Sequence, residues 1–87
     1  MKYQEGLQKT KDWLKNASAL EIKDIIEKAG LSEQKANIIL LKYCNEKSRL
    51  HISTDSRVAL NETGVSKKTT QALRKIHAAL CWLGILD

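Results

Sequence analysis

The chain has 87 residues and a net charge of +5, and 43% of its residues are hydrophobic and 29% charged. This composition is typical of one small globular domain and excludes a disordered chain, and no apolar stretch approaches the roughly 18 residues that a membrane span needs. Proline is absent and glycine occurs four times, so few residues interrupt helices and we expect an all-α fold.

Helices are predicted throughout the first half of the chain. The first, over about residues 2–15, is weakly amphipathic. The second is SALEIKDIIEKAG, in which Ser18 and Glu21 stand at capping-box spacing and Gly30 follows the last apolar residue. The third, LSEQKANIILLKYCNEKS, starts at Ser32 and is expected to be the central core helix, because its apolar residues recur along one face.

The second half is predicted as a short helix, a tight turn and a long helix. RLHIS alternates weakly and is typical of a short extended segment, and TDSRVALNETG is predicted as a short helix that ends at Gly64. Val65 would then turn into the core, and Ser66 would cap the last helix, KKTTQALRKIHAALCWL. The leucine and isoleucine residues of this last helix repeat at helical steps, so it should be the longest and most regular element.

The positive charge is concentrated in the last helix. Residues 1–30 hold six lysines against five acids and residues 31–63 hold five cations against four acids, whereas residues 64–87 hold four cations against one acid. On a helical wheel the apolar residues share one side, and the opposite side carries Lys67, Gln71, Arg74, Lys75 and Ala78. Arginine and lysine can donate to guanine and glutamine can pair with adenine, so this side suits the major groove of DNA, although any amphipathic helix exposes a polar side.

The order of a short helix, a turn that contains glycine and a capped longer helix is that of a helix-turn-helix. LSEQKANIILLKYCNEKS followed by VALNETGVSKKTTQALRKIHAAL resembles the C-terminal promoter-reading domains of bacterial sigma factors and the related phage regulators, with Gly64, Val65 and Ser66 at the family's turn. The ending LCWLGILD is also similar to winged-helix regulators, in which RLHIS would be the first short strand. The resemblance to these families implies DNA binding through the exposed positions of the last helix, which are here Lys67, Lys68, Thr70, Gln71, Arg74 and Lys75.

We therefore predict a compact all-α bundle of about five helices that contains a helix-turn-helix, or a rudimentary winged helix. It would be a single domain, in which residues 1–30 support a DNA-binding core over residues 31–87. The predicted function is sequence-specific binding of double-stranded DNA, as a transcriptional regulator of a bacterium, a phage or a plasmid. Arg49 and Arg57 would contact the DNA backbone. A role in DNA packaging uses the same motif and stays open.

The rival hypothesis is a helical protein-interaction adaptor or anti-regulator that makes no contact with DNA. It would bind its partner through Trp82 and the apolar C-terminal tail, residues 81–86, which has more apolar residues than one helix face can bury. The tail could fold over the first helix, against Tyr3, Leu7 and Trp13, or form a homodimer, as many helix-turn-helix proteins do. The sequence leaves both alternatives open.

Enzyme and metal chemistry have weak support in the sequence. Cys44, His51, His77 and Cys81 are residue types that bind zinc, but their spacing matches no common zinc finger, and no motif supplies a base for either cysteine. We therefore predict no metal, no other cofactor and no enzymatic activity. The segment MKYQEGLQKTKDW lacks the apolar core of a signal peptide, so a cytoplasmic protein without membrane contact is expected.

Overall fold

The computed structural model describes residues 3–86, apart from the side chains of residues 3–6 and of Arg49. Helices α1 (Tyr3–Asn16), α2 (Ala19–Ala29) and α3 (Glu33–Ile39) come first, and α3 continues into the short π-helix η1 (Leu40–Cys44). They are followed by α4 (Arg49–Thr54) and by the long α5 (Glu62–Trp82). The described residues contain no strand, so the predicted compact all-α bundle is confirmed and no β wing lies within residues 3–86.

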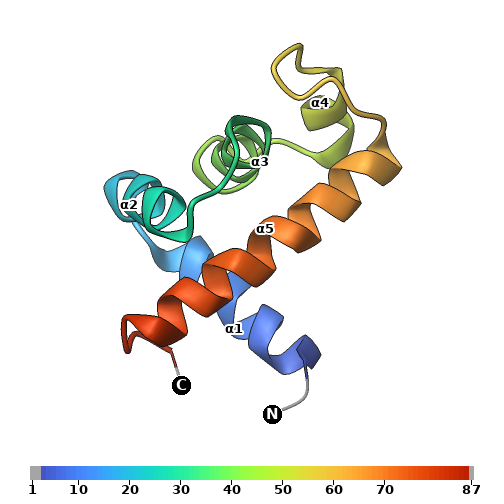
Figure 1. Ribbon diagram of the computed structural model, residues 1–87. Coiled ribbons are helices and arrows are strands. Elements are labelled where there is room, and N and C mark those ends of the chain that lie inside the picture. The colour runs from blue at the N-terminus through green and yellow to red at the C-terminus, as the bar shows by residue number, and fades with distance from the viewer. Residues whose placement is uncertain (1–2, 87) are drawn as a thin grey trace.

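Figure 1 shows how the other helices lie against one side of α5. This helix, drawn in orange and red, runs diagonally across the molecule and crosses α1, while α2, α3 and α4 lie along its upper side. It packs against α1, α2, α3 and α4 alike, since its 21 residues are enough to reach all of them. The central helix is therefore α5, and the prediction that the third helix would be central is wrong.

The predicted starts of α2 and α3 are confirmed. The Ser18 hydroxyl accepts a hydrogen bond from the Glu21 backbone N–H at 3.2 Å, and the Glu21 carboxylate accepts one from the Ser18 N–H at 3.0 Å. Ser32 caps α3 in a similar way, by accepting from the Lys35 N–H at 3.4 Å. Gly30 ends α2 in the left-handed conformation, with φ 68°. Such caps can be predicted because the two partners lie three residues apart in the chain.

The segment before α5 differs from the prediction. RLHIS is part of the helix α4 and not a strand, because the Ser48 hydroxyl caps its first turn by accepting from the His51 N–H at 3.2 Å. The short helix predicted over TDSRVALNETG is also wrong. Residues 55–61 form a turn and a loop, in which the Asp55 carbonyl accepts from two backbone N–H groups at 3.0 Å. A positive φ of 53° at Ala59 interrupts helical conformation there.

The helix α5 begins earlier than predicted. The side-chain oxygen of Asn61 accepts a hydrogen bond from the Gly64 N–H at 2.7 Å and so caps the helix. Gly64, Val65 and Ser66 consequently lie inside the first turns of α5, and the turn of a helix-turn-helix predicted at these residues is wrong. A Cβ at Gly64 would lie 3.2 Å from Asn61 Oδ1 and 3.3 Å from Leu60, so glycine allows close packing at this cap. The helices that pack together here are α4 and α5.

The core has two parts, and α5 contributes to both. The larger part consists of Leu14, Ile22, Ile25, Ile26, Ile39, Ala72, Leu73, Ile76 and Leu80. The smaller part consists of Ile38, Leu41, Ile52, Val58 and Val65, so Val65 is buried as predicted. Because α5 supplies side chains to both parts, its position holds the two halves of the bundle together.

The start of α5 can be tested by stability measurements. We expect Asn61→Ala to lower the free energy of unfolding by about 1 kcal/mol, because the Gly64 N–H loses its partner. Ser66→Ala should lower it by less, since residue 66 lies inside the helix, where alanine is favoured. Urea unfolding followed by circular dichroism measures both changes. A larger loss for Ser66→Ala than for Asn61→Ala would contradict this helix start.

Candidate nucleic-acid interface

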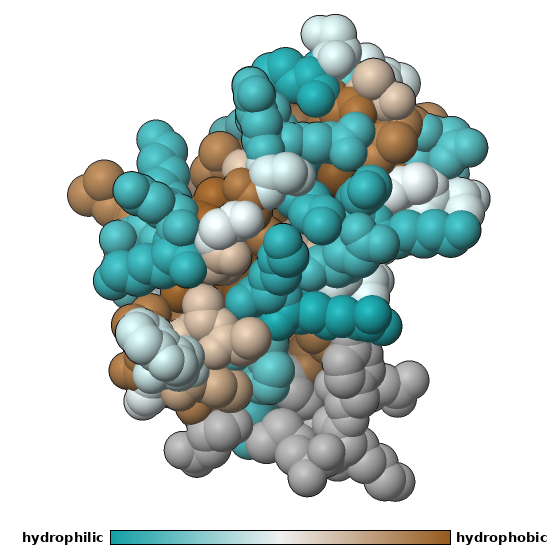
Figure 2. All heavy atoms as spheres, in the orientation of Figure 1, coloured by the Kyte–Doolittle hydropathy of each residue, from teal (hydrophilic) through white to brown (hydrophobic). Residues whose placement is uncertain are grey.

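One side of α5 is buried in the core and the other faces solvent. The buried residues are Val65, Thr69, Ala72, Leu73, Ile76 and Leu80. The exposed residues on the opposite side include Lys67, Gln71, Arg74, Lys75 and Ala78. Figure 2 shows hydrophilic side chains, in teal, over the middle of this helix. The two sides are divided as the helical wheel predicts.

Lys35 of α3 adds a cation that sequence reasoning missed. The pKa of Lys35 is lowered, first because its ammonium group is desolvated by burial and then because Lys75 and Lys68 lie nearby. Lys68 and Lys75 therefore lie near enough to Lys35 for their charges to act on its ammonium group. A signal was present in the sequence, because Lys35 stands three and four residues before the buried Ile38 and Ile39. A lysine at that spacing lies at the edge of a buried helix face, where its apolar stem packs and its charge reaches solvent.

We call this surface the basic face and define it as Lys35 of α3 with Lys67, Lys68, Gln71, Arg74 and Lys75 of α5. Among the described residues, no carboxylate lies within ion-pair distance of Lys35, Lys68 or Lys75. Their positive charge is therefore left for solvent ions or an anionic partner to neutralise. A chain with a net charge of +5 thus concentrates part of its excess on one surface shared by two helices.

A shallow hollow lies on one flank of the basic face. It has a volume of about 320 Å³ and is lined by Ser66, Lys67, Thr70, Gln71 and Arg74. The Thr70 hydroxyl is half-buried and donates to the Ser66 carbonyl at 3.1 Å. Because its proton is used inside the helix, Thr70 is the predicted site residue that is least able to donate to a phosphate. Lys68 is half-buried as well, whereas Lys67, Gln71 and Arg74 are exposed.

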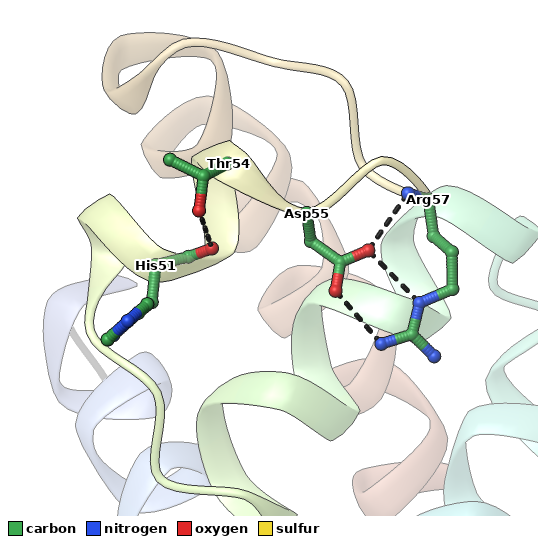
Figure 3. Close-up of polar contacts among 4 residues, drawn as sticks. All are labelled: His51, Thr54, Asp55 and Arg57. Carbon is green, nitrogen blue, oxygen red and sulfur yellow. Dashed lines mark hydrogen bonds and ion pairs between the residues drawn. The ribbon is translucent and has the colours of Figure 1, made fainter.

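Arg57 is held by Asp55 in the loop before α5 (Figure 3). Two side-chain nitrogens of Arg57 donate to the two carboxylate oxygens of Asp55 at 3.0 Å each, and the Arg57 backbone N–H donates to Asp55 Oδ1 at 2.8 Å. These hydrogen bonds lower the pKa of Asp55 to about 2. Arg57 lines a hollow with residues of α2, α3 and η1, and no described residue of α5 lines it. Arg57 and the residues of the basic face therefore line different hollows. The side chain of Arg49, the other arginine predicted to contact the DNA backbone, lies outside the described residues.

A second polar cluster lies between α1 and α5. The buried Thr10 hydroxyl lies 3.1 Å from His77 Nδ1, and Cys81 Sγ lies 3.6 Å from His77 Nε2. These are neighbouring groups, but the described side chains include no set of three or more histidine, cysteine, aspartate and glutamate residues that could hold a metal ion. The cluster satisfies a buried hydroxyl at the contact between the first and last helices.

The C-terminal tail is divided between the core and solvent. Gly84 follows α5 with φ 76°, and Leu86 then packs against the larger core cluster, which Trp13 of α1 also contacts. Trp82 and Ile85 are 86% and 48% exposed. The tail thus folds back in part onto the core and still leaves apolar side chains in solvent. Its predicted contact with the first helix stays a prediction, and the side chain of Tyr3 lies outside the described residues.

No protein-family model, curated protein or solved structure matches this chain. None of the helices within residues 3–86 combines the length and the apolar character that crossing a bilayer requires.

The pair of Asp55 and Arg57 can be tested by titration. We expect Asp55 to titrate near pH 2 in the folded chain, below its ordinary pKa of 3.8. Because the folded-state pKa is depressed, the stability that the pair contributes is present above about pH 4 and is lost as the pH falls toward 2. Arg57→Gln should return the pKa toward 3.8, as measured by the carboxyl carbon shift in NMR. An unchanged pKa in the variant would mean that Arg57 is not the cause.

Proposed function

We propose that the chain binds double-stranded DNA through the basic face, with α5 in the major groove. The observation that carries this proposal is that α3 packs on α5 and brings Lys35 to the side of α5 that carries Lys68 and Lys75, where the described residues place no carboxylate within ion-pair distance. The repulsion among these cations is relieved when DNA phosphates bind, and the release of counterions from DNA adds to the affinity.

The residues of α5 suit two different roles on DNA. Gln71 and Arg74 lie on the exposed side and can read base edges, because arginine pairs with guanine and glutamine with adenine through two hydrogen bonds. The lysines on either flank can contact phosphates. The exposed stretch from Lys67 to Ala78 spans about 17 Å, and a major groove about 12 Å wide admits a helix. The small side chain of Ala78 allows close approach at the far end of this stretch.

The packing of α4 against α5 also supports the proposed placement of α5 in the major groove. Ile52 of α4, Val58 of the loop and Val65 of α5 share the smaller buried cluster. The helix α4 therefore fixes the N-terminal half of α5, as the first helix of a helix-turn-helix braces the recognition helix. A more specific proposal is that the chain is a sequence-specific transcriptional regulator of a bacterium, a phage or a plasmid. Because Gly64, Val65 and Ser66 lie inside α5, this proposal rests on the exposed residues of α5 and not on the turn through which the chain resembles sigma factors.

DNA binding can be measured by fluorescence anisotropy with DNA selected from a random pool. The affinity should fall as the salt concentration rises, and Arg74→Ala should cost about 1 to 3 kcal/mol and relax selectivity at one base pair. Lys75→Gln should weaken binding to all sequences and reduce the slope of log affinity against log salt by about 1. The matched control is Lys15→Gln, which removes an exposed lysine of α1 outside the basic face.

The proposal fails if no sequence is enriched, if the affinity does not depend on salt, or if Lys15→Gln weakens binding as much as Lys75→Gln does. Because both lysines are exposed, neither substitution should lower the stability by more than about 0.5 kcal/mol. A loss of affinity can then be assigned to the lost charge and not to unfolding.

The exposed Trp82 favours a second candidate function, in which the C-terminal tail binds a protein partner or a second copy of the chain. In a homodimer with two-fold symmetry the tail would face its own copy, and the lysines beside Trp82, Lys28 and Lys75, would be brought near like charges. Any homodimer through the tail should therefore weaken as the salt concentration falls, and Ile85→Lys should abolish it. Sedimentation equilibrium at low and high salt measures this. A monomer at both salt concentrations would contradict the homodimer.

A further inference from the structure

A second hollow lies at the C-terminal end of α5, beside the basic face. It has a volume of about 530 Å³. Ala29, Ala78 and Ala79 form apolar walls, Trp82 stands at one side, and Lys28 and Lys75 bring two ammonium groups to it. Figure 2 shows the change of surface at this end of α5, where pale and brown residues replace the teal ones. We call this the Trp82 hollow.

The fold does not use the indole of Trp82. Its side chain is 86% exposed, whereas Leu80, two residues earlier, is fully buried and supplies the core contact of this turn. An exposed tryptophan keeps a large flat apolar surface in water, and such side chains are enriched where proteins bind partners. The alanines that line the hollow with Trp82 have small side chains and leave room beside the indole for a flat ligand.

Charge identifies what kind of flat ligand fits this hollow. Lys75 belongs both to the basic face and to the Trp82 hollow, so the two surfaces are continuous along α5. Lys28 is paired with Asp24 at 2.9 Å, which leaves Lys75 as the cation better placed to hold an anion. An apolar platform beside a cation is the arrangement by which proteins bind a nucleobase and its phosphate.

We propose that the Trp82 hollow binds an unpaired base of DNA, stacked on the indole, with a phosphate of the same strand at Lys75. This inference rests on the proposed binding of duplex DNA to the basic face, and it adds a class of target, namely duplexes that carry a single-stranded extension. Trp82 lies seven residues after Lys75, which is about 10 Å along the helix axis, so a strand that leaves the basic face reaches the indole within a few nucleotides.

The experiment compares four probes in binding to the full chain: a blunt duplex, the same duplex with a single-stranded extension, the single strand alone, and an acidic amphipathic peptide. The chain has two tryptophans, so Trp13→Phe leaves Trp82 as the sole indole reporter. We expect the extension to quench Trp82 fluorescence and to increase the affinity at least about fivefold over the blunt duplex. Trp82→Ala should abolish this gain and leave the affinity for the blunt duplex unchanged, and Trp82→Phe should keep most of it.

The controls separate stacking from general loss of apolar surface. Leu20→Ala removes another exposed apolar side chain, which is 79% exposed on α2, and should leave all affinities unchanged. Circular dichroism and urea unfolding check that each variant folds, and Trp82→Phe keeps the test open if Trp82→Ala is unstable.

Each outcome decides between the proposals. Equal affinity for the blunt and extended duplexes, or a gain that persists in folded Trp82→Ala, overturns the base-stacking inference alone. Absence of binding to every DNA overturns the proposed function as well. A shift of Trp82 emission with the acidic peptide, without any change on DNA, overturns the inference in favour of a protein helix in the hollow.

Discussion

Burial of one side of α5 is the constraint on which the rest of the structure depends. Ile76 and Leu80 are fully buried, and the helix packs against α1, α2, α3 and α4. A chain of this size buries only roughly 60% of its unfolded surface, so even its central helix keeps one side in solvent. That side carries the cations because the apolar residues recur at steps of three and four and occupy the whole inner side. The exposed surface of the molecule is thus fixed by the same packing that stabilises its core.

The positive charges of the basic face act on one another because residues from two helices share this surface. Taken alone, Lys35, Lys68 and Lys75 would be ordinary solvated lysines, whose charge is useful for solubility. Packing of α3 on α5 brings them together, and the pKa of Lys35 falls in part because of the other two. Their repulsion opposes folding, and an anion that binds only the folded chain would both relieve the repulsion and stabilise the fold by mass action. Binding of such an anion would therefore be linked to stability through these residues.

Features set by neighbours in the sequence could be predicted, and features set by packing between distant residues could not. The starts of α2 and α3 follow from a serine and a backbone N–H three residues apart. The same reasoning failed before α5, because Asn61 and Ser66 are both good capping residues and local sequence does not rank them. The close approach of Gly64 to the Leu60 side chain agrees with Asn61 as the cap, but this contact could not be predicted from the sequence. The exposed positions of α5 were predictable from periodicity, whereas the approach of Lys35 depends on how α3 packs on α5.

The division of α5 into two sides also means that the exposed surface can be changed by substitution without changing the core. Lys67, Gln71, Arg74 and Lys75 are exposed and share no position with the buried side, so changing them alters the surface charge and leaves the core packing intact. Lys68 and Thr70 are half-buried and lie at the border, where a substitution affects both the surface and the core packing.

Trp82 lies at the end of the exposed side of α5, and its indole is not packed in the core. Trp82 differs from the other exposed apolar side chains because it lines one hollow with alanines and with Lys75, and the proposed ligand, an anion with a flat apolar group, matches that combination.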